Sequence, residues 1–189
     1  MSTKPAPPAE TAPHLAVDIR HLPGIRPLAA DYAYHFDQVA PFFAGNPADT
    51  QSCAQVVQQT LAHPRQRAAV AALIGAQQQR RGAPPAAVER ARQLADPRSV
   101  AIVTGQQAGL FGGPLYTLLK ALTAIQLAER MAQQQGVPVV PVFWVESEDH
   151  DWDEVRSCTV LDAELGPHTL SLPALDKGDP VPVAAVPLP

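Results

Sequence analysis

The sequence has little of what marks several large classes of protein. Only two of its 189 residues are cysteines, Cys53 and Cys158. They lie far apart without a CxxC motif, which excludes a disulfide framework and fits a reducing compartment. No apolar run approaches the roughly 18–20 residues of a membrane span. The first residues, MSTKPAPPAETAP, lack the apolar core of a secretory signal. We therefore expect a cytoplasmic protein that does not partner a membrane.

An excess of positive charge is also missing. The chain carries 14 Lys and Arg against 18 Asp and Glu, a formal net charge of −4, so we expect no nucleic-acid partner. Proline, by contrast, is abundant, with 21 residues. Because proline resists both helix and sheet, its density predicts a disordered arm over residues 1–13. The last stretch, LPALDKGDPVPVAAVPLP, is again proline-rich and has no closing element, so we expect the sequence to be incomplete at its C-terminus.

The pattern of apolar residues changes near residue 98. Before it, segment 14–97 predicts helices near 28–39, 50–63, 65–80 and 85–94, separated by proline and glycine. After it, the apolar run RSVAIVTG is typical of a buried parallel strand. A long helix from Pro114 to Gly136 and a second strand, VPVVPVFWV, follow. A strand, a helix and a strand in about 50 residues form a βαβ unit and predict an α/β fold.

Two further features of this region are expected from the pattern alone. The stretch SCTVLDA predicts a third strand. Pro141 should lie near the start of the second strand or against a bulge, because a central strand position would lose a ladder hydrogen bond. The apolar side of the long helix should be formed by Leu115, Leu118, Leu119, Leu122, Ile125 and either Leu127 or Ala128.

A glycine-rich loop, TGQQAGLFGG at residues 104–113, lies between the first strand and the long helix. Ligands of open parallel sheets collect at the carboxyl ends of strands, and a helix N-terminus there favours an anion. The glycine spacing matches neither GxGxxG nor the P-loop, so neither assignment follows. The amides of Gln106 and Gln107 can both donate and accept hydrogen bonds, which suits a polar substrate. The alternative is that the glycines only let strand and helix pack closely.

An acidic loop, VESEDHDWDEV at residues 145–155, follows the second strand at the same sheet edge. If the chain is extended there, Glu148 and His150 share one face and Asp149 and Asp151 the other. A carboxylate beside an imidazole suits proton transfer. Asp and His side chains could also form part of a divalent cation site. In the remaining alternative, Ser147 or Asp151 caps a helix and the other acids are solvated.

These two loops supply the candidate site residues, with no metal ligand assigned. The predicted catalytic residues are Glu148, Asp149, His150 and Asp151. The predicted substrate-binding residues are Gly105, Gln106, Gln107, Gly112, Gly113, Tyr116, Lys120 and Ser147.

Over residues 20–160 the chain resembles a known family. The stretches TGQQAGLFGGPLYTLLKALTAIQLA and VPVVPVFWVESEDHDWDEV, in this order, are similar to the bacillithiol biosynthesis cysteine-adding enzymes, as is the upstream LPGIRPLAADYAYHFDQVAPFFAGNP. Gly112 departs from the pattern, which more often has threonine there. The resemblance implies that residues 98–189 are the first part of a Rossmann-like core, preceded by the helical segment 14–97. The family's chains are considerably longer and add a C-terminal coiled coil.

The resemblance also implies an activity. The family members are ligases that join the carboxyl group of L-cysteine to the amine of glucosaminyl malate, the last step toward bacillithiol. Amide formation from a carboxylate in water needs activation, by ATP or another nucleotide, but the sequence has no His-x-Gly-His motif in its first loop and leaves the cofactor unidentified. A homodimer through the coiled coil is a further option that the resemblance raises.

Combining both lines of reasoning, we expect the glycine loop to hold an anionic or sugar portion of the substrate. The acidic loop would then orient the reacting amine or assist its deprotonation. Two alternatives stay open. One is a metal-dependent hydrolase built on the EDHD residues of the acidic loop, and the other is a non-catalytic nucleotide-binding module.

Overall fold

The computed structural model describes residues 16–175 and 181–187. The arm predicted over residues 1–13 lies outside these residues. The chain divides into two compact units, Met1–Cys53 and Ala54–Pro189, and each is treated by itself below. Among the described residues, none of the helices combines the length and the apolar character that crossing a membrane requires.

The first unit is helical. It contains the short helices η1 (Ile19–His21), α1 (Pro27–Tyr34), α2 (Phe36–Val39) and η2 (Ala40–Phe42), followed by the start of α3 (Thr50–Ala62). The single helix expected near 28–39 is divided at His35, whose backbone is not helical (φ −138°, ψ 52°). The ring of Tyr32 packs against Phe43 and Phe36, with centroids 4.7 and 5.7 Å away. These three rings form an aromatic cluster that packs α1 and α2 against the residue after η2.

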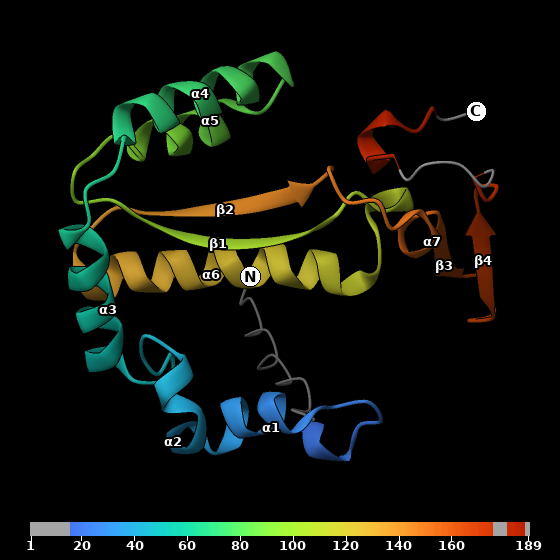
Figure 1. Cartoon of the computed structure of the whole chain (residues 1–189), viewed down its shortest axis with the longest axis horizontal. Helices are drawn as coiled ribbons and strands as arrows, with labels where there is room; N and C mark the ends of the chain where they lie inside the picture. Colours follow the sequence, from blue (N-terminus) through green and yellow to red (C-terminus); the bar gives the residue numbers. More distant parts are fainter. Residues whose placement is uncertain (1–15, 176–180, 188–189) are drawn as a thin grey trace, which may run out of the picture. The chain divides into compact units, whose positions relative to one another are not determined.

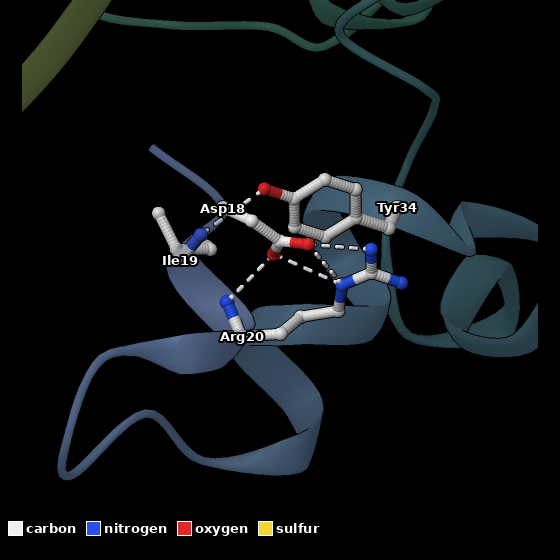
Figure 2. A network of polar contacts seen from close by, with 4 residues as sticks. All are labelled: Asp18, Ile19, Arg20 and Tyr34. Atoms are coloured by element: carbon white, nitrogen blue, oxygen red, sulfur yellow. Dashed lines mark hydrogen bonds and ion pairs between the residues drawn. The ribbon is translucent and has the colours of Figure 1, made fainter. Parts of the chain in front are cut away.

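A polar network fastens η1 to α1 (Figure 2). The guanidinium group of Arg20 bonds the carboxylate of Asp18, with Nη2–Oδ2 at 2.6 Å, and lies 4.4 Å from the ring centroid of Tyr34. The Tyr34 hydroxyl accepts the backbone N–H of Ile19 at 3.2 Å. The bonds from Arg20 hold the pKa of the Asp18 carboxyl far below its ordinary value.

The second unit is built on a parallel βαβ arrangement. Its elements are α4 (Arg67–Arg80), α5 (Pro85–Gln93), β1 (Val100–Gln107), α6 (Leu115–Gln135) and β2 (Val139–Glu146). Strands β1 and β2 pair in parallel. Helix α6 packs along one face of the pair, and α4 and α5 lie on the other (Figure 1). The predicted α/β class is confirmed, and the helices and strands lie within a few residues of their expected positions.

The register of β1 and β2 runs from Val100 opposite Val139 to Gln107 opposite Glu146. Pro141 is the third residue of β2, near its start as expected. The carbonyl of Pro138 accepts the N–H of Val100 at 3.0 Å just before the ladder begins. At this amino end the two strands are closely covered, since Val139 and Val140 are each only 2% exposed.

Of the residues expected on the apolar side of α6, Ala128 is buried, but most of the buried side differs from the expected one. The leucines at 115, 118, 119 and 122 and Ile125 are exposed, and the buried residues are Ala124, Ala128 and Met131. Both sets recur at helical spacing, on different sides of the helix. Alanine at the contact lets the helix approach the sheet closely, so the smaller residues face β1 and β2.

The C-terminal part of the unit forms a second, separate sheet. Strands β3 (Ser157–Leu161) and β4 (Pro167–Ser171) pair antiparallel. The third strand expected at SCTVLDA therefore exists as β3, but among the described residues it pairs with β4 and does not extend the β1–β2 sheet. The remaining elements are η3 (Leu110–Gly112), α7 (Trp152–Val155) and η4 (Val183–Ala185).

Candidate functional site

The candidate site lies where β1 and β2 end. Strand β1 continues two residues beyond the expected Gly105, so Gln106 and Gln107 are strand residues paired with Val145 and Glu146. Both glutamines are half-buried. Their side chains therefore start from a fixed backbone and not from a free loop.

Gly105 has a packing role in this pair of strands. A Cβ atom at this position would lie 2.5 Å from the backbone oxygen of Trp144. Any larger residue would push β2 away, because a backbone atom cannot rotate aside. Gly105 thus allows a close approach of two strands, not of strand and helix as the structural alternative supposed, and its contact with substrate stays a prediction.

The glycines before α6 are required by backbone conformation. Gly112 and Gly113 have φ values of 87° and 81°, in the region that disfavours other residues. They follow Phe111, itself at φ 52°, and complete the turn between η3 and α6. Their conformation turns the chain from β1 into α6, and it neither requires nor excludes a bound substrate.

Two side chains from the first turns of α6 reach the glutamines. The Lys120 ammonium donates to the backbone oxygen of Gly105 at 3.1 Å and to Oε1 of Gln106 at 2.8 Å. It also lies 5.2 Å from the ring centroid of Tyr116. The Tyr116 hydroxyl accepts an N–H of Gln106 at 3.2 Å. Lys120 and Tyr116, both predicted from the sequence, are thus joined to the end of β1.

The acidic loop is a turn and not the extended chain that the alternation of its residues assumed. The Asp149 carboxylate accepts the backbone N–H of Asp151 at 3.1 Å. Asp151 in turn caps α7 by accepting the N–H of Glu154 at 3.1 Å. The prediction that Glu148 and His150 share one face assumed an extended chain, so it no longer follows. The capping alternative applies to Asp151, whose carboxylate keeps further lone pairs free.

The other predicted residues of this loop are more open. His150 and Glu148 are exposed, whereas Ser147 is half-buried. The backbone oxygens of Ser147 and Asp149 accept N–H groups of Ala184 and Val183, at 3.0 and 2.8 Å. Segment η4 therefore holds the backbone of the loop in place and leaves the imidazole of His150 accessible.

Glu154 connects the two loops, and it was not among the predicted site residues. Its carboxylate accepts an N–H of the Gln107 side chain at 3.2 Å, across 47 positions of sequence. The acidic run contains Glu154, but the sequence gives no sign of this contact, which depends on the turn at Asp149–Asp151 and on the short helix α7. The structure thus brings Gln107 beside the acidic loop through Glu154.

The electrostatics of the site favour an ionised Asp149. The backbone N–H of Asp151 is the main cause that lowers the pKa of the Asp149 carboxyl, and the amide of Gln107 lowers it further. Partial desolvation opposes both. Across residues 16–175 and 181–187, no three His, Cys, Asp or Glu side chains are grouped as metal ligands.

A parallel βαβ unit with helices on both faces of its strands defines an α/β domain of the Rossmann-like class. The comparison with protein families agrees. Residues 15–186 match the model described as "Bacillithiol biosynthesis BshC, N-terminal Rossmann-like domain". The chain belongs to this family.

Individual relatives support the same assignment. A protein of Solibacter usitatus is 38% identical over 174 residues, covering 89% of this chain and 31% of the relative. One of Salinibacter ruber is 42% identical over 134 residues, 71% of this chain and 24% of the relative. One of Symbiobacterium thermophilum is 46% identical over 123 residues, which cover 65% of this chain and 22% of the relative. Each carries the name "Putative cysteine ligase BshC". The chain spans less than a third of the length of these curated relatives.

Proposed function

We propose that this domain belongs to a cytoplasmic ligase of bacillithiol biosynthesis that joins L-cysteine to glucosaminyl malate. The observation that carries the proposal is the family match over residues 15–186, together with relatives named as cysteine ligases. The polar site at the ends of β1 and β2 is the place in this domain that suits the chemistry.

The reaction forms a C–N bond between the cysteine carboxyl carbon and the amine of glucosaminyl malate. An activating group, supplied by ATP or another nucleotide, would turn a carboxylate oxygen into a leaving group. The amine must lose a proton to attack, and the proton must pass to a base. The acidic loop is the candidate for this task, because His150 is exposed and the backbone N–H of Asp151, 3.1 Å from the Asp149 carboxylate, favours the ionised form of Asp149.

The glutamines and the glycine turn would bind and orient the substrate. The amides of Gln106 and Gln107 stand on the rigid end of β1, where they can fix hydroxyl or amine groups. Ser147, Glu148 and Asp151 would complete the rim on the side of the acidic loop. No observation on the described residues favours the hydrolase or the non-catalytic module.

The test is ligation by the full-length protein carrying Gln107→Ala or His150→Ala, with the product measured by mass spectrometry. We expect kcat/KM to fall about 100-fold for His150→Ala, as for loss of a general base, and about tenfold for Gln107→Ala. Gln126→Ala and His63→Ala change the same residue types at exposed positions outside the site and should leave turnover unchanged. Wild-type turnover in both site variants would refute the site, and absence of ligation by the wild type would refute the function.

A further inference from the structure

A continuous chain of side-chain hydrogen bonds crosses the candidate site. The Lys120 ammonium donates to Oε1 of Gln106 at 2.8 Å. Nε2 of Gln106 donates to Oε1 of Gln107. Nε2 of Gln107 donates to Oε2 of Glu154 at 3.2 Å. The chain therefore runs from a cation on α6, through two neighbouring amides on β1, to an anion on α7.

The charged ends give this chain a direction. An ammonium group can only donate hydrogen bonds, and an ionised carboxylate can only accept them. A glutamine amide can do either, and its two orientations differ little in shape. With Lys120 at one end and Glu154 at the other, every bond points the same way, and each amide has one orientation that satisfies both neighbours. Such bonds polarise one another, so each end supports the bonds at the other.

The same contacts determine what the amides can still offer. Gln106 uses both of its N–H groups, toward Gln107 and toward the Tyr116 hydroxyl at 3.2 Å. Its oxygen accepts only Lys120, and the oxygen of Gln107 accepts only Gln106, among the contacts of the described residues. Since a carbonyl oxygen has two lone pairs, each glutamine keeps one acceptor position for a ligand.

We propose that Lys120 and Glu154 are positioning residues that lock the amides of Gln106 and Gln107 in one orientation, with a lone pair of each carbonyl oxygen presented to hydrogen-bond donors of the substrate. Glu154 thereby gains a role that the sequence did not suggest, and Lys120, predicted as a substrate-binding residue, acts through Gln106. The inference rests on the proposed function only for the identity of the substrate. The orientation of the amides is a property of the protein without substrate.

The experiment follows the side-chain amide resonances of Gln106 and Gln107 in the ¹⁵N-labelled 189-residue chain, without substrate. Lys120→Met and Glu154→Ala each remove the charged group at one end of the series of hydrogen bonds. We expect either change to shift the resonances of both glutamines and to speed their amide exchange about fivefold, because loss of one end weakens the whole chain. Glu154→Gln keeps an acceptor oxygen and should restore most of the wild-type exchange rate.

Matched controls separate this effect from a general change in charge. Glu129→Ala and Arg130→Met alter exposed charges on α6 and should leave both glutamine signals unchanged. Unchanged backbone resonances of β1 and β2 show that each variant is folded. The inference is overturned if Lys120→Met affects only Gln106 and Glu154→Ala only Gln107, or if neither variant affects either residue.

This outcome is separable from the proposed function. Independent amides in a protein that ligates cysteine would refute only the positioning role. Coupled amides in a full-length protein that does not ligate cysteine would refute only the function.

Discussion

The two ends of the β1–β2 sheet differ in what their side chains do. At the amino end Ser99 is fully buried, and its hydroxyl donates to the backbone oxygen of Leu94 at 3.2 Å and accepts from Arg67 at 3.0 Å. Val139 and Val140 close this end with apolar side chains. At the carboxyl end the same strands finish in half-buried glutamines and glutamate. One pair of strands thus has buried, closely packed residues at its amino end and half-buried polar side chains at its carboxyl end.

The largest expected effect comes from placing a charge at the closed end. Val139→Asp buries a carboxylate without a partner and should lower the free energy of unfolding by about 4 kcal/mol, measured by urea denaturation. Val103→Asp makes the same change on β1 at a side chain that is 64% exposed, and should cost less than about 1 kcal/mol. Equal losses in the two variants would show that the amino end is not the better-packed part.

A smaller loss is expected where the strands come closest. Gly105→Ala forces a Cβ atom against the Trp144 backbone oxygen and should destabilise the chain by about 2 kcal/mol. Gly75→Ala on α4 meets no atom within 4 Å and should stabilise the helix by up to about 1 kcal/mol. Thermal denaturation measures both variants. A neutral Gly105→Ala would mean that the strands can separate at the site without cost.

Single hydrogen bonds at the two ends should also differ. Ser99→Ala removes the buried hydroxyl that donates to the backbone oxygen of Leu94 and accepts from Arg67. Arg67 keeps its 2.7 Å bond to the backbone oxygen of residue 99, so the variant should cost about 1 kcal/mol of unfolding free energy, mainly at Leu94. Tyr116→Phe removes a hydroxyl that is open to water and should cost less than about 0.5 kcal/mol. Chemical denaturation measures the unfolding free energy of both variants. A larger loss of unfolding free energy for Tyr116→Phe than for Ser99→Ala would contradict the expected difference.

The smallest effect concerns pH at the carboxyl end. The pKa of Asp149 is lowered in the folded chain, mainly by the backbone N–H of Asp151. Its contribution to stability is therefore present above the unfolded-state pKa of 3.8 and is lost as the pH falls below that value. Asp149→Asn should show a shallower loss of thermal stability between about pH 5 and about pH 2 than the wild type. Identical curves would contradict the turn at Asp149.

Much of the fold could be predicted because local signals agreed with it. Prolines and apolar spacing located α3, α4 and α5, and the β-branched runs located β1 and β2 within two residues at most of their ends. The end of β1 was placed too early, at Gly105, because glycine and glutamine are weak strand formers. Pairing with Val145 and Glu146 overrides that preference and carries the strand through Gln107.

The buried side of α6 could not be chosen by periodicity. Leucines and alanines both recur at helical spacing, and greater hydrophobicity favoured the leucines. Close packing on the sheet selected Ala124 and Met131 beside Ala128, which alone belonged to the expected set. The size of side chain that fits between α6 and the sheet depends on the distance between them, and the sequence does not give this distance.

The sequence predicted which residues lie near the candidate site, but not the hydrogen bonds between them. Glycine, glutamine and acidic residues near the ends of two strands predicted that both loops lie at one sheet edge, and the structure brings Gln107 and Glu154 into contact there. The alternation of Glu148 and His150 assumed an extended chain, and an Asx turn at Asp149 replaces it. The contact between Gln107 and Glu154 joins residues 47 positions apart, so no local pattern could reveal it.

The claim on which the account depends is that the end of β1 and the acidic loop form one site. The most direct test is a nuclear Overhauser measurement between the side-chain amide protons of Gln107 and the γ protons of Glu154 in the isotopically labelled chain. We expect a cross-peak, accompanied by those of the β1–β2 pairing. Absence of that cross-peak in a chain whose β1–β2 contacts are intact would contradict the account.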